Sequence, residues 1–168
     1  MDTAKIKALA SAPYELKLAR LDAQLKRLES VLVAFSAGVD STVLLHAAHR
    51  VLGEGARGFI ADSPSLPRAE LKQARELAAE MGCTLEVVKT SELEDESYAV
   101  NNSMRCYFCK EALFEAMSQA QLALGFRAMA FGEVLDDLGD DRPGARAASE
   151  AGVFAPLSQS GMTSTPWA

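Results

Sequence analysis

A short turn of small and polar residues, Ser36-Ala37-Gly38-Val39-Asp40-Ser41, has the composition of a phosphate-binding loop. Small residues let the backbone approach phosphate oxygens, and the N–H groups of the turn and of a following helix point at the negative charge. Ser36 and Ser41 add hydroxyl donors, and the Asp40 carboxylate suits a Mg²⁺ ion that bridges phosphates. We expect all six residues to contact a nucleotide phosphate, and Asp40 also to act in catalysis. The alternative is a capping turn, in which Asp40 or Ser41 only satisfies the first N–H groups of the helix.

An aspartate-rich segment, residues 136–144, is the second place where we expect chemistry. It follows an apolar run that predicts a strand, a position suited to a Mg²⁺ ligand or to a contact with a nucleotide ribose. Arg142, in a Pro-Gly turn, could hold a phosphate or a carboxylate with its fork of donors. We expect Asp137 to bind the metal and the nucleotide, and Arg142 to act in catalysis. A solvated acidic loop is the alternative. That alternative is our interpretation for the other three aspartates, Asp136, Asp140 and Asp141.

The chain has three cysteines, an odd number that favours thiol or metal chemistry over a disulfide framework. Cys106 and Cys109 stand two residues apart at an expected helix start, so they could hold a metal or an iron-sulfur cluster. They could also form a redox pair, because a helix N-terminus with Arg105 and Lys110 nearby stabilises thiolates. A metal site would need further ligands, so a structural pair is the alternative. Cys83 stands alone, and we expect a small buried hydrophobe there.

Two patterns resemble functional sites, but their contexts argue against that role. The run Gly53-Glu54-Gly55-Ala56-Arg57-Gly58 matches GxGxxG, yet it follows an expected helix and precedes a strand, the reverse of the dinucleotide fingerprint. We expect a simple connection there. His46 and His49 share a helix with no carboxylate or cysteine nearby in the sequence, so we expect packed or surface histidines rather than metal ligands. No Walker loop of the form GxxxxGK[ST] occurs in the chain.

Apolar patterning predicts the elements that must position these residues. From Tyr14 to Leu28 the apolar residues fall in steps of three and four, which indicates one amphipathic helix within residues 1–30. The run Val31-Leu32-Val33-Ala34-Phe35 is typical of a strand buried on both faces. Further expected strands are 59–61, 85–88, 128–134 and 153–155, and further expected helices are 42–52, 68–81 and one from the two paired cysteines to about residue 124. This alternation predicts a doubly wound α/β fold, with a mostly parallel five-stranded sheet and helices on both faces.

Composition limits the classes of protein that the chain can represent. Its 168 residues are 49% hydrophobic and 24% charged, which suggests one domain with a substantial core. The formal net charge of −6 gives no overall field that attracts nucleic acid. No window approaches the roughly 18 apolar residues of a membrane span, and the N-terminus lacks a signal-peptide core. We expect a cytoplasmic protein that binds neither nucleic acid nor membrane.

The first loop resembles the SGGxDS pyrophosphate loop of the N-type ATP pyrophosphatases, the PP-loop superfamily, with Ala37 at the first motif glycine. Two later segments are similar to the RCYxCK and DDLGDYRPG segments of the ATP-dependent sacrificial sulfur transferase LarE family. They are Arg105-Cys106-Tyr107-Phe108-Cys109-Lys110 and residues 135–144. Residues 155–157 and 161–163 resemble the family's next landmarks. Three motifs in the same order make the resemblance fairly specific over roughly residues 14 to 163.

This resemblance implies an adenine nucleotide alpha hydrolase-like fold of the HUP type. It implies an enzyme that uses ATP and Mg²⁺ to adenylylate a carboxylate of a nicotinic acid mononucleotide derivative, releasing pyrophosphate. A sulfur nucleophile then displaces AMP, on the route to the nickel-pincer nucleotide cofactor. A related subgroup holds an iron-sulfur cluster. The resemblance places Ala61 and Asp62 where the superfamily receives adenine and ribose, and we expect Gly132 to contact the nucleotide as well.

The family continues for roughly another hundred residues, which include the sulfur-donating cysteine, and its intact members are expected to form homo-oligomers. We therefore expect an N-terminal helix (1–30), an ATP-binding domain (31–157), an irregular tail (158–168), no sulfur-transfer domain and impaired activity. Two other functions stay open. One is an ATP- or AMP-binding module without turnover. The other is a different PP-loop enzyme, such as a tRNA thiolase or an NAD or asparagine synthetase-like ligase.

Overall fold

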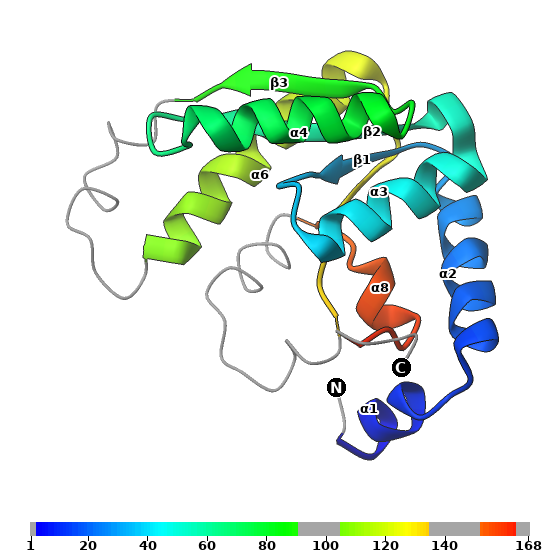
Figure 1. Cartoon of the computed structure of the whole chain (residues 1–168). Coiled ribbons are helices and arrows are strands. Elements are labelled where there is room, and N and C mark those ends of the chain that lie inside the picture. Colours follow the sequence, from blue (N-terminus) through cyan, green and yellow to red (C-terminus); the bar gives the residue numbers. More distant parts are fainter. Residues whose placement is uncertain (1–2, 91–104, 135–151, 164–168) are drawn as a thin grey trace.

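The computed structural model describes residues 3–90, 105–134 and 152–163, which form a parallel sheet with helices on both faces (Figure 1). The elements in chain order are α1 (Thr3–Ala10), α2 (Tyr14–Leu28), β1 (Val31–Ala34), α3 (Val39–Leu52), the short 3₁₀ helix η1 (Gly53–Gly55), β2 (Ala56–Asp62), α4 (Arg68–Glu80), β3 (Leu85–Lys89), α6 (Arg105–Leu124), β4 (Ala128–Ala130) and α8 (Pro156–Gln159).

The sheet has the strand order β3-β2-β1-β4, and every neighbouring pair is parallel. β1 is central, and its Val31 lies opposite Ala56 of β2 and Ala128 of β4. All four residues of β1 are buried, as the continuous apolar run predicts for a strand covered on both faces. The expected doubly wound α/β fold is confirmed.

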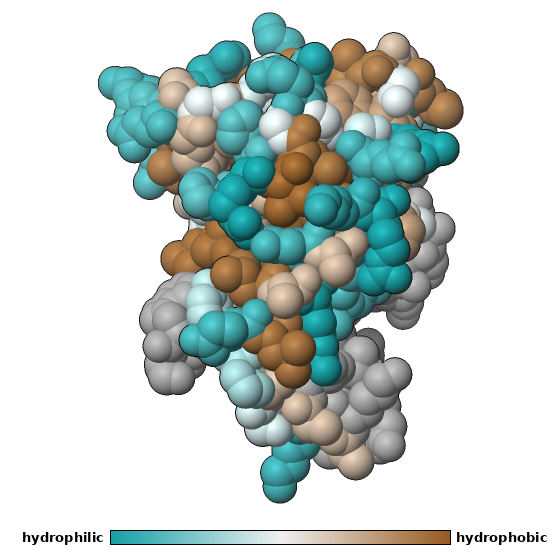
Figure 2. Space-filling model, turned by 90° about the vertical axis from the view of Figure 1, so that its right-hand side faces the viewer, coloured by the Kyte–Doolittle hydropathy of each residue, from teal (hydrophilic) through white to brown (hydrophobic). Residues whose placement is uncertain are grey.

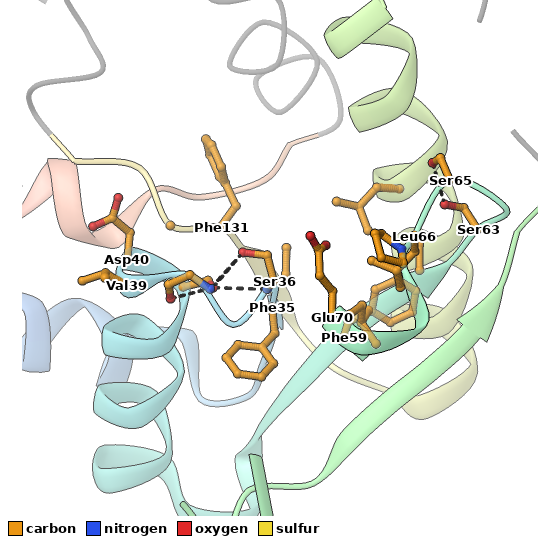
Figure 3. Close-up of a pocket in the computed structure, with 18 residues that line it drawn as sticks. Phe35, Ser36, Val39, Asp40, Phe59, Ser63, Ser65, Leu66, Glu70 and Phe131 are labelled. Atoms are coloured by element: carbon orange, nitrogen blue, oxygen red, sulfur yellow. Dashed lines mark hydrogen bonds between the residues drawn. The ribbon is translucent and has the colours of Figure 1, made fainter. Parts of the chain in front are cut away.

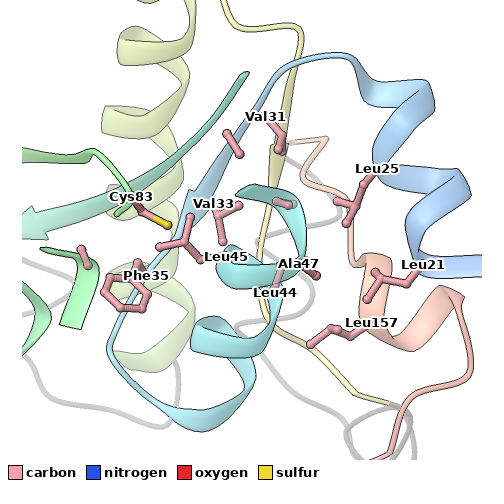
Figure 4. Close-up of a cluster of buried hydrophobic side chains, with 14 of the residues drawn as sticks. Leu21, Leu25, Val31, Val33, Phe35, Leu44, Leu45, Ala47, Cys83 and Leu157 are labelled. Atoms are coloured by element: carbon pink, nitrogen blue, oxygen red, sulfur yellow. The ribbon is translucent and has the colours of Figure 1, made fainter. Parts of the chain in front are cut away.

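Alternate residues of β1, together with Phe35 after it, pack into two separate cores, because successive side chains of a strand point to opposite faces. Val31, Val33 and Phe35 belong to a cluster that α2, α3, α4 and α8 complete (Figure 4). Leu32 and Ala34 belong to a second cluster, which α6 covers. Because β1 pairs in parallel with both β2 and β4, the carboxyl ends of these three strands meet at one edge of the sheet.

The sheet described has four strands rather than the expected five. Phe154 makes a single parallel bridge with Ala130. Its carbonyl accepts the Phe131 N–H at 3.0 Å, and its own N–H donates to the Met129 carbonyl at 2.8 Å. The chain then enters α8 at Pro156, which has no N–H to continue a ladder. The fifth strand is therefore reduced to one bridge beside β4.

Other boundaries also differ from the expected ones. Two helices replace the single N-terminal helix, because Pro13 precedes α2 and α1 has already ended at Ala10. The start of the tail is not irregular, since it includes α8 and is followed by Ser160 and Met162, which are 0% and 3% exposed. Leu157 and Met162 pack into the larger core. This segment is therefore an integral part of the folded domain.

In the described part of the chain, no helix combines the length and apolarity needed to cross a bilayer. The face shown in Figure 2 carries hydrophobic residues in patches among hydrophilic ones. Tyr14 and Leu16 of α2 are exposed apolar side chains, at 40% and 44%. Scattered exposure of this kind is ordinary for a protein surface.

Candidate functional site

The loop between β1 and α3 lines a cavity of about 370 Å³ at the carboxyl ends of the strands (Figure 3). This is the edge at which open α/β sheets bind ligands. The structure brings five of the six loop residues together with Ala61 of β2 and with Gly132, which follows β4. The full lining comprises Ala34, Phe35, Ser36, Gly38, Val39, Asp40, Ser41, Phe59, Ile60, Ala61, Ser63, Ser65, Leu66, Pro67, Glu70, Leu113, Phe131 and Gly132.

Ser41 ties the loop together from the first turn of α3. Its Oγ accepts the Ser36 N–H at 3.2 Å, lies 3.2 Å from the Ser36 Oγ and donates to the Gly38 carbonyl at 3.3 Å. The Ser36 Oγ in turn accepts the Gly38 N–H at 3.3 Å. Ser41 is only 7% exposed, whereas Ser36 and Gly38 are exposed, so Ser41 is the buried anchor of an otherwise accessible network. No side-chain capping hydrogen bond forms at the start of α3, whose N-cap is Gly38, so Ser41 organises the turn without capping the helix.

Ala37 adopts a left-handed backbone conformation, with φ of +64°. This region costs an L-residue roughly 1–2 kcal/mol, whereas glycine adopts it without that cost. The glycine of the SGGxDS pattern therefore has a conformational reason at this position. Ala37 is the one loop residue that does not line the cavity, so its role is to set the path of the backbone.

Replacing Ala37 with glycine should stabilise the protein by about 1 kcal/mol, because the relieved strain exceeds the added backbone entropy of the unfolded chain. Urea denaturation measures this difference. The matched control is Ala79→Gly on the exposed face of α4, which should instead destabilise by about 0.5–1 kcal/mol. A variant at position 37 that is no more stable than the natural chain would refute the strain argument.

Gly132 brings the chain after β4 against the start of α3. A Cβ at this position would lie 2.8 Å from the Ser41 backbone nitrogen and 2.9 Å from the Asp40 carbonyl carbon. Neither neighbour is a flexible side chain that can move aside. Gly132 therefore shapes one wall of the cavity through close backbone approach.

Asp40 lines the cavity from the first turn of α3. Mg²⁺ on a nucleotide is commonly held by one or two carboxylates together with phosphate oxygens, so a single carboxylate beside a phosphate loop fits this ion. Among the residues that the structure describes, no group of three or more His, Cys, Asp or Glu could hold a metal alone. The donor set thus suits a metal that arrives with a nucleotide. Asp137 lies outside the described residues.

Apolar side chains also line the cavity, and the sequence patterns did not predict them. Phe59 and Leu66 lie across from the loop together with the polar Ser63, Ser65 and Glu70, whereas Phe131 lies beside Ser36 of the loop (Figure 3). Leu113 of α6 completes the apolar part of the lining. Phe131 packs edge-on against Phe114, with ring centroids 5.9 Å apart and an interplanar angle of 69°. A polar loop with aromatic and aliphatic side chains around it suits a ligand with a charged part and a flat apolar part.

Asp62, expected beside the nucleotide, lies outside this cavity. It lines a neighbouring hollow with Ser63, Pro64, Arg68 and Lys89. Its two carboxylate oxygens accept hydrogen bonds from the two terminal nitrogens of Arg68, and the bond from Nη1 to Oδ2 is 3.1 Å long. This hydrogen bonding holds the pKa of the Asp62 carboxyl below its ordinary value of 3.8. Its carboxylate is thus already engaged by Arg68.

Removing Arg68 should return the pKa of Asp62 toward its ordinary value. A carboxyl whose pKa is lowered by folding contributes stability above its unfolded pKa and loses it as the pH falls through the folded value. The free energy of unfolding should therefore be higher for the natural chain than for Arg68→Ala at pH 7, and the difference should shrink below pH 3.8. Urea denaturation at both pH values checks this, and a difference that grows in acid would contradict it.

The remaining candidates fall partly outside the described residues. Arg142 lies there, as do the side chains of Cys106 and Cys109, although both cysteines belong to the first turns of α6. A cluster or metal at these cysteines stays a prediction.

Cys83 is buried in the larger core as expected, and burial, followed by the charge of Glu54, raises the pKa of its thiol. This agrees with a structural role for that cysteine.

The two patterns judged non-functional also have ordinary surroundings. The GxGxxG run forms η1 and the start of β2, so it connects α3 to a strand as expected. His46 is exposed on α3 and His49 is half-buried. Neither belongs to a candidate metal group among the described residues.

Comparison with curated proteins identifies relatives at moderate identity. The chain is 41% identical over 145 residues to the uncharacterized protein slr1717 of Synechocystis sp., covering 86% of this chain and 54% of that protein. It is 33% identical over 150 residues to the pyridinium-3,5-bisthiocarboxylic acid mononucleotide synthase of Lactiplantibacillus plantarum, covering 89% and 54%. The chain thus spans about half the length of these relatives. No protein-family model matches it.

Solved structures share the fold at low sequence identity. A glutamine-dependent NAD⁺ synthetase from Acinetobacter baumannii, in complex with ADP, aligns with a TM-score of 0.69 at 15% identity, over 86% of this chain and 30% of that one. An NH3-dependent NAD synthetase from Campylobacter jejuni aligns with a TM-score of 0.57 at 19% identity, over 82% and 59%. At these identities the likeness shows the fold alone.

Proposed function

Because this chain is a LarE homologue with the fold of the PP-loop synthetases, we propose that it binds ATP in the loop cavity and adenylylates a carboxylate there. The substrate we propose is a dicarboxylated pyridinium mononucleotide, in keeping with the name of the Lactiplantibacillus relative. The observation that carries the proposal is the cavity itself. It joins the Ser36–Ser41 turn and the N-terminus of α3 to an opposite wall that carries the apolar side chains of Phe59 and Leu66 (Figure 3).

The loop end of the cavity has the chemistry to bind a triphosphate. The N-terminus of α3 supplies oriented N–H groups and a partial positive charge. The Ser36 and Ser41 hydroxyls are held in a fixed network before any ligand arrives, so their orientation costs little on binding. None of the residues described around the cavity is Lys or Arg. Within the described lining, the dipole of α3 and a cation held by Asp40 would offset the triphosphate charge, and Arg142, which we expect to hold a phosphate, lies outside the described residues.

The reaction we propose is an in-line displacement at the α-phosphorus of ATP. A carboxylate oxygen of the pyridinium substrate forms the new P–O bond, and the bond to the bridging oxygen breaks. Pyrophosphate leaves with the electron pair. The protein's part is to align the two reactants, and Mg²⁺ bound at Asp40 would supply charge neutralisation of the leaving pyrophosphate. The acyl adenylate formed is the electrophile that a sulfur nucleophile attacks, with AMP leaving, in the sulfur transfer we propose for the family.

Exchange of labelled pyrophosphate into ATP tests this proposal. With Mg²⁺ and the dicarboxylated nicotinic acid mononucleotide, the purified chain should exchange label, and omitting the carboxylate substrate should abolish the exchange. Binding of ATP without exchange would replace the proposal by a nucleotide-binding module, which the partial coverage of the relatives also permits. Exchange that depends on tRNA instead would indicate the thiolase alternative.

A further inference from the structure

The cavity contains a second carboxylate that the proposed reaction does not use. Glu70 lies in the first turn of α4 and lines the cavity. In Figure 3 its carboxylate points into the space between Ser36 of the loop and Leu66 of the opposite wall. Within the described residues its side chain makes no hydrogen bond or ion pair, in contrast to Asp62, which is held by Arg68. Glu70 is thus the acidic side chain that presents acceptors to a ligand from this wall.

The charge of Glu70 limits which part of a nucleotide it can face. A carboxylate repels phosphate oxygens, and no cationic side chain in the described lining stands between them. With the bridging cation placed at Asp40, Glu70 is better matched to a neutral part of the ligand that donates hydrogen bonds. The phosphates occupy the Ser36–Ser41 end, and the base suits the apolar side chains of Phe59 and Leu66. The ribose joins these two parts, and it must pass the position of Glu70.

We propose that Glu70 accepts hydrogen bonds from the 2′- and 3′-hydroxyls of the ATP ribose and makes the site selective for ribonucleotides. This inference rests on the proposed function, because it places ATP in the same cavity. A vicinal diol offers two donors to the two oxygens of one carboxylate. The edge of adenine offers one donor next to an acceptor nitrogen, which a carboxylate would repel. Two matched donors make the ribose the better partner.

Glu70 also has a structural effect that the experiment must separate from recognition. An acidic residue in the first turn stabilises a helix through the macrodipole, so Glu70→Ala could weaken α4. Glu70→Gln keeps one acceptor oxygen and the shape of the side chain. Glu80→Ala is the matched control, because Glu80 is exposed at the other end of α4 and lies outside the cavity lining. Thermal unfolding of all three variants reports on the helix itself.

Calorimetric titration of the full chain with Mg·ATP, 2′-deoxyATP and 3′-deoxyATP tests the proposal. The natural chain and Glu80→Ala should bind ATP about tenfold or more tightly than either deoxynucleotide, since each lost hydrogen bond to a charged group has an effect of this size. Glu70→Ala should bind all three nucleotides alike, and more weakly than the natural chain binds either deoxynucleotide, because both hydrogen bonds are lost rather than one. Glu70→Gln should retain part of the preference.

Each contrary outcome has its own meaning. If the natural chain binds no nucleotide, the proposed function fails, and the role of Glu70 fails with it. If it binds ATP and both deoxynucleotides equally, the role of Glu70 alone is overturned. Purine riboside triphosphate, which lacks the 6-amino group, completes the test. If Glu70→Ala weakens ATP but not this analogue, the carboxylate contacts the base and our proposal is wrong.

Discussion

Gly132→Ala is expected to destabilise the protein by about 1–3 kcal/mol and to weaken ATP binding about tenfold or more. The added Cβ would lie 2.8 Å from the Ser41 backbone nitrogen and 2.9 Å from the Asp40 carbonyl carbon. Relief requires either the segment after β4 or the first turn of α3 to move. Both line the cavity, so the geometry of the phosphate end changes with the packing. Urea denaturation and calorimetric titration with Mg·ATP measure the two effects.

The control for this substitution is Gly53→Ala. Gly53 has a φ of +58° and open space around its Cβ position, so alanine there costs about 1–2 kcal/mol through backbone conformation alone. It lies at the far end of α3, away from the cavity lining. ATP affinity should therefore be unchanged in Gly53→Ala at a similar loss of stability. Equal affinities for the two variants would show that Gly132 has no special relation to the site.

Asp40→Asn is expected to lower the rate of ATP–pyrophosphate exchange about 100-fold, because a metal at the leaving phosphates contributes several kcal/mol to phosphoryl chemistry. Asparagine keeps the size of the side chain but loses the charge that holds Mg²⁺. Exchange rates measured across a Mg²⁺ titration should show a higher Mg²⁺ requirement in the variant. The binding of metal-free ATP should not weaken, since the substitution removes a negative charge from the cavity.

Asp62→Asn provides the comparison for Asp40. Asp62 is also an aspartate near a strand end, but it lies outside the cavity with its carboxylate bound by Arg68. Its substitution should leave the Mg²⁺ dependence of exchange as it is in the natural chain. Undiminished exchange in Asp40→Asn at every Mg²⁺ concentration would remove Asp40 from the metal site.

The central features of the fold follow from local patterns in the sequence. β1 is a continuous apolar run, and the helix periodicity after it predicts α3, so the turn between them had to lie at the carboxyl edge of a parallel sheet. The cavity accordingly contains Ser36, Asp40 and Ser41 together with Gly132. Ser36, Asp40 and Ser41 are identifiable because the chemistry of phosphate binding requires small and polar residues at one turn, whereas Gly132 comes from the separate segment after β4.

Other parts of the site depend on contacts that no local pattern encodes. In the sequence, Glu70 is an ordinary acidic residue in the first turn of a helix. It lines the cavity only because the fold places α4 beside the loop. Phe131 and Leu113 come from separate elements that meet after folding. Asp62 is the last residue of β2, a position typical of ligand-binding aspartates, but Arg68 six residues later binds its carboxylate. Such pairings are set by the path of the chain between them.

The boundaries that differ are explained by single residues. Pro156 has no N–H, so the pairing of Phe154 with Ala130 ends in α8 rather than in a fifth strand. Pro13 restricts the residue before it and separates α2 from α1. Periodicity alone cannot resolve such interruptions, because both proline effects act over one or two residues.

The most direct test of the account is an amide NMR titration of the isotope-labelled chain with Mg·ATP. We predict that the largest shift changes occur at Ser36, Gly38, Ser41 and Gly132, which surround the phosphate end of the cavity. The amide signals of Leu18 and Met81, which line a separate hollow beside α3, should not shift. Changes confined to that hollow, or no changes at saturating nucleotide, would contradict the assignment of the loop cavity as the ATP site.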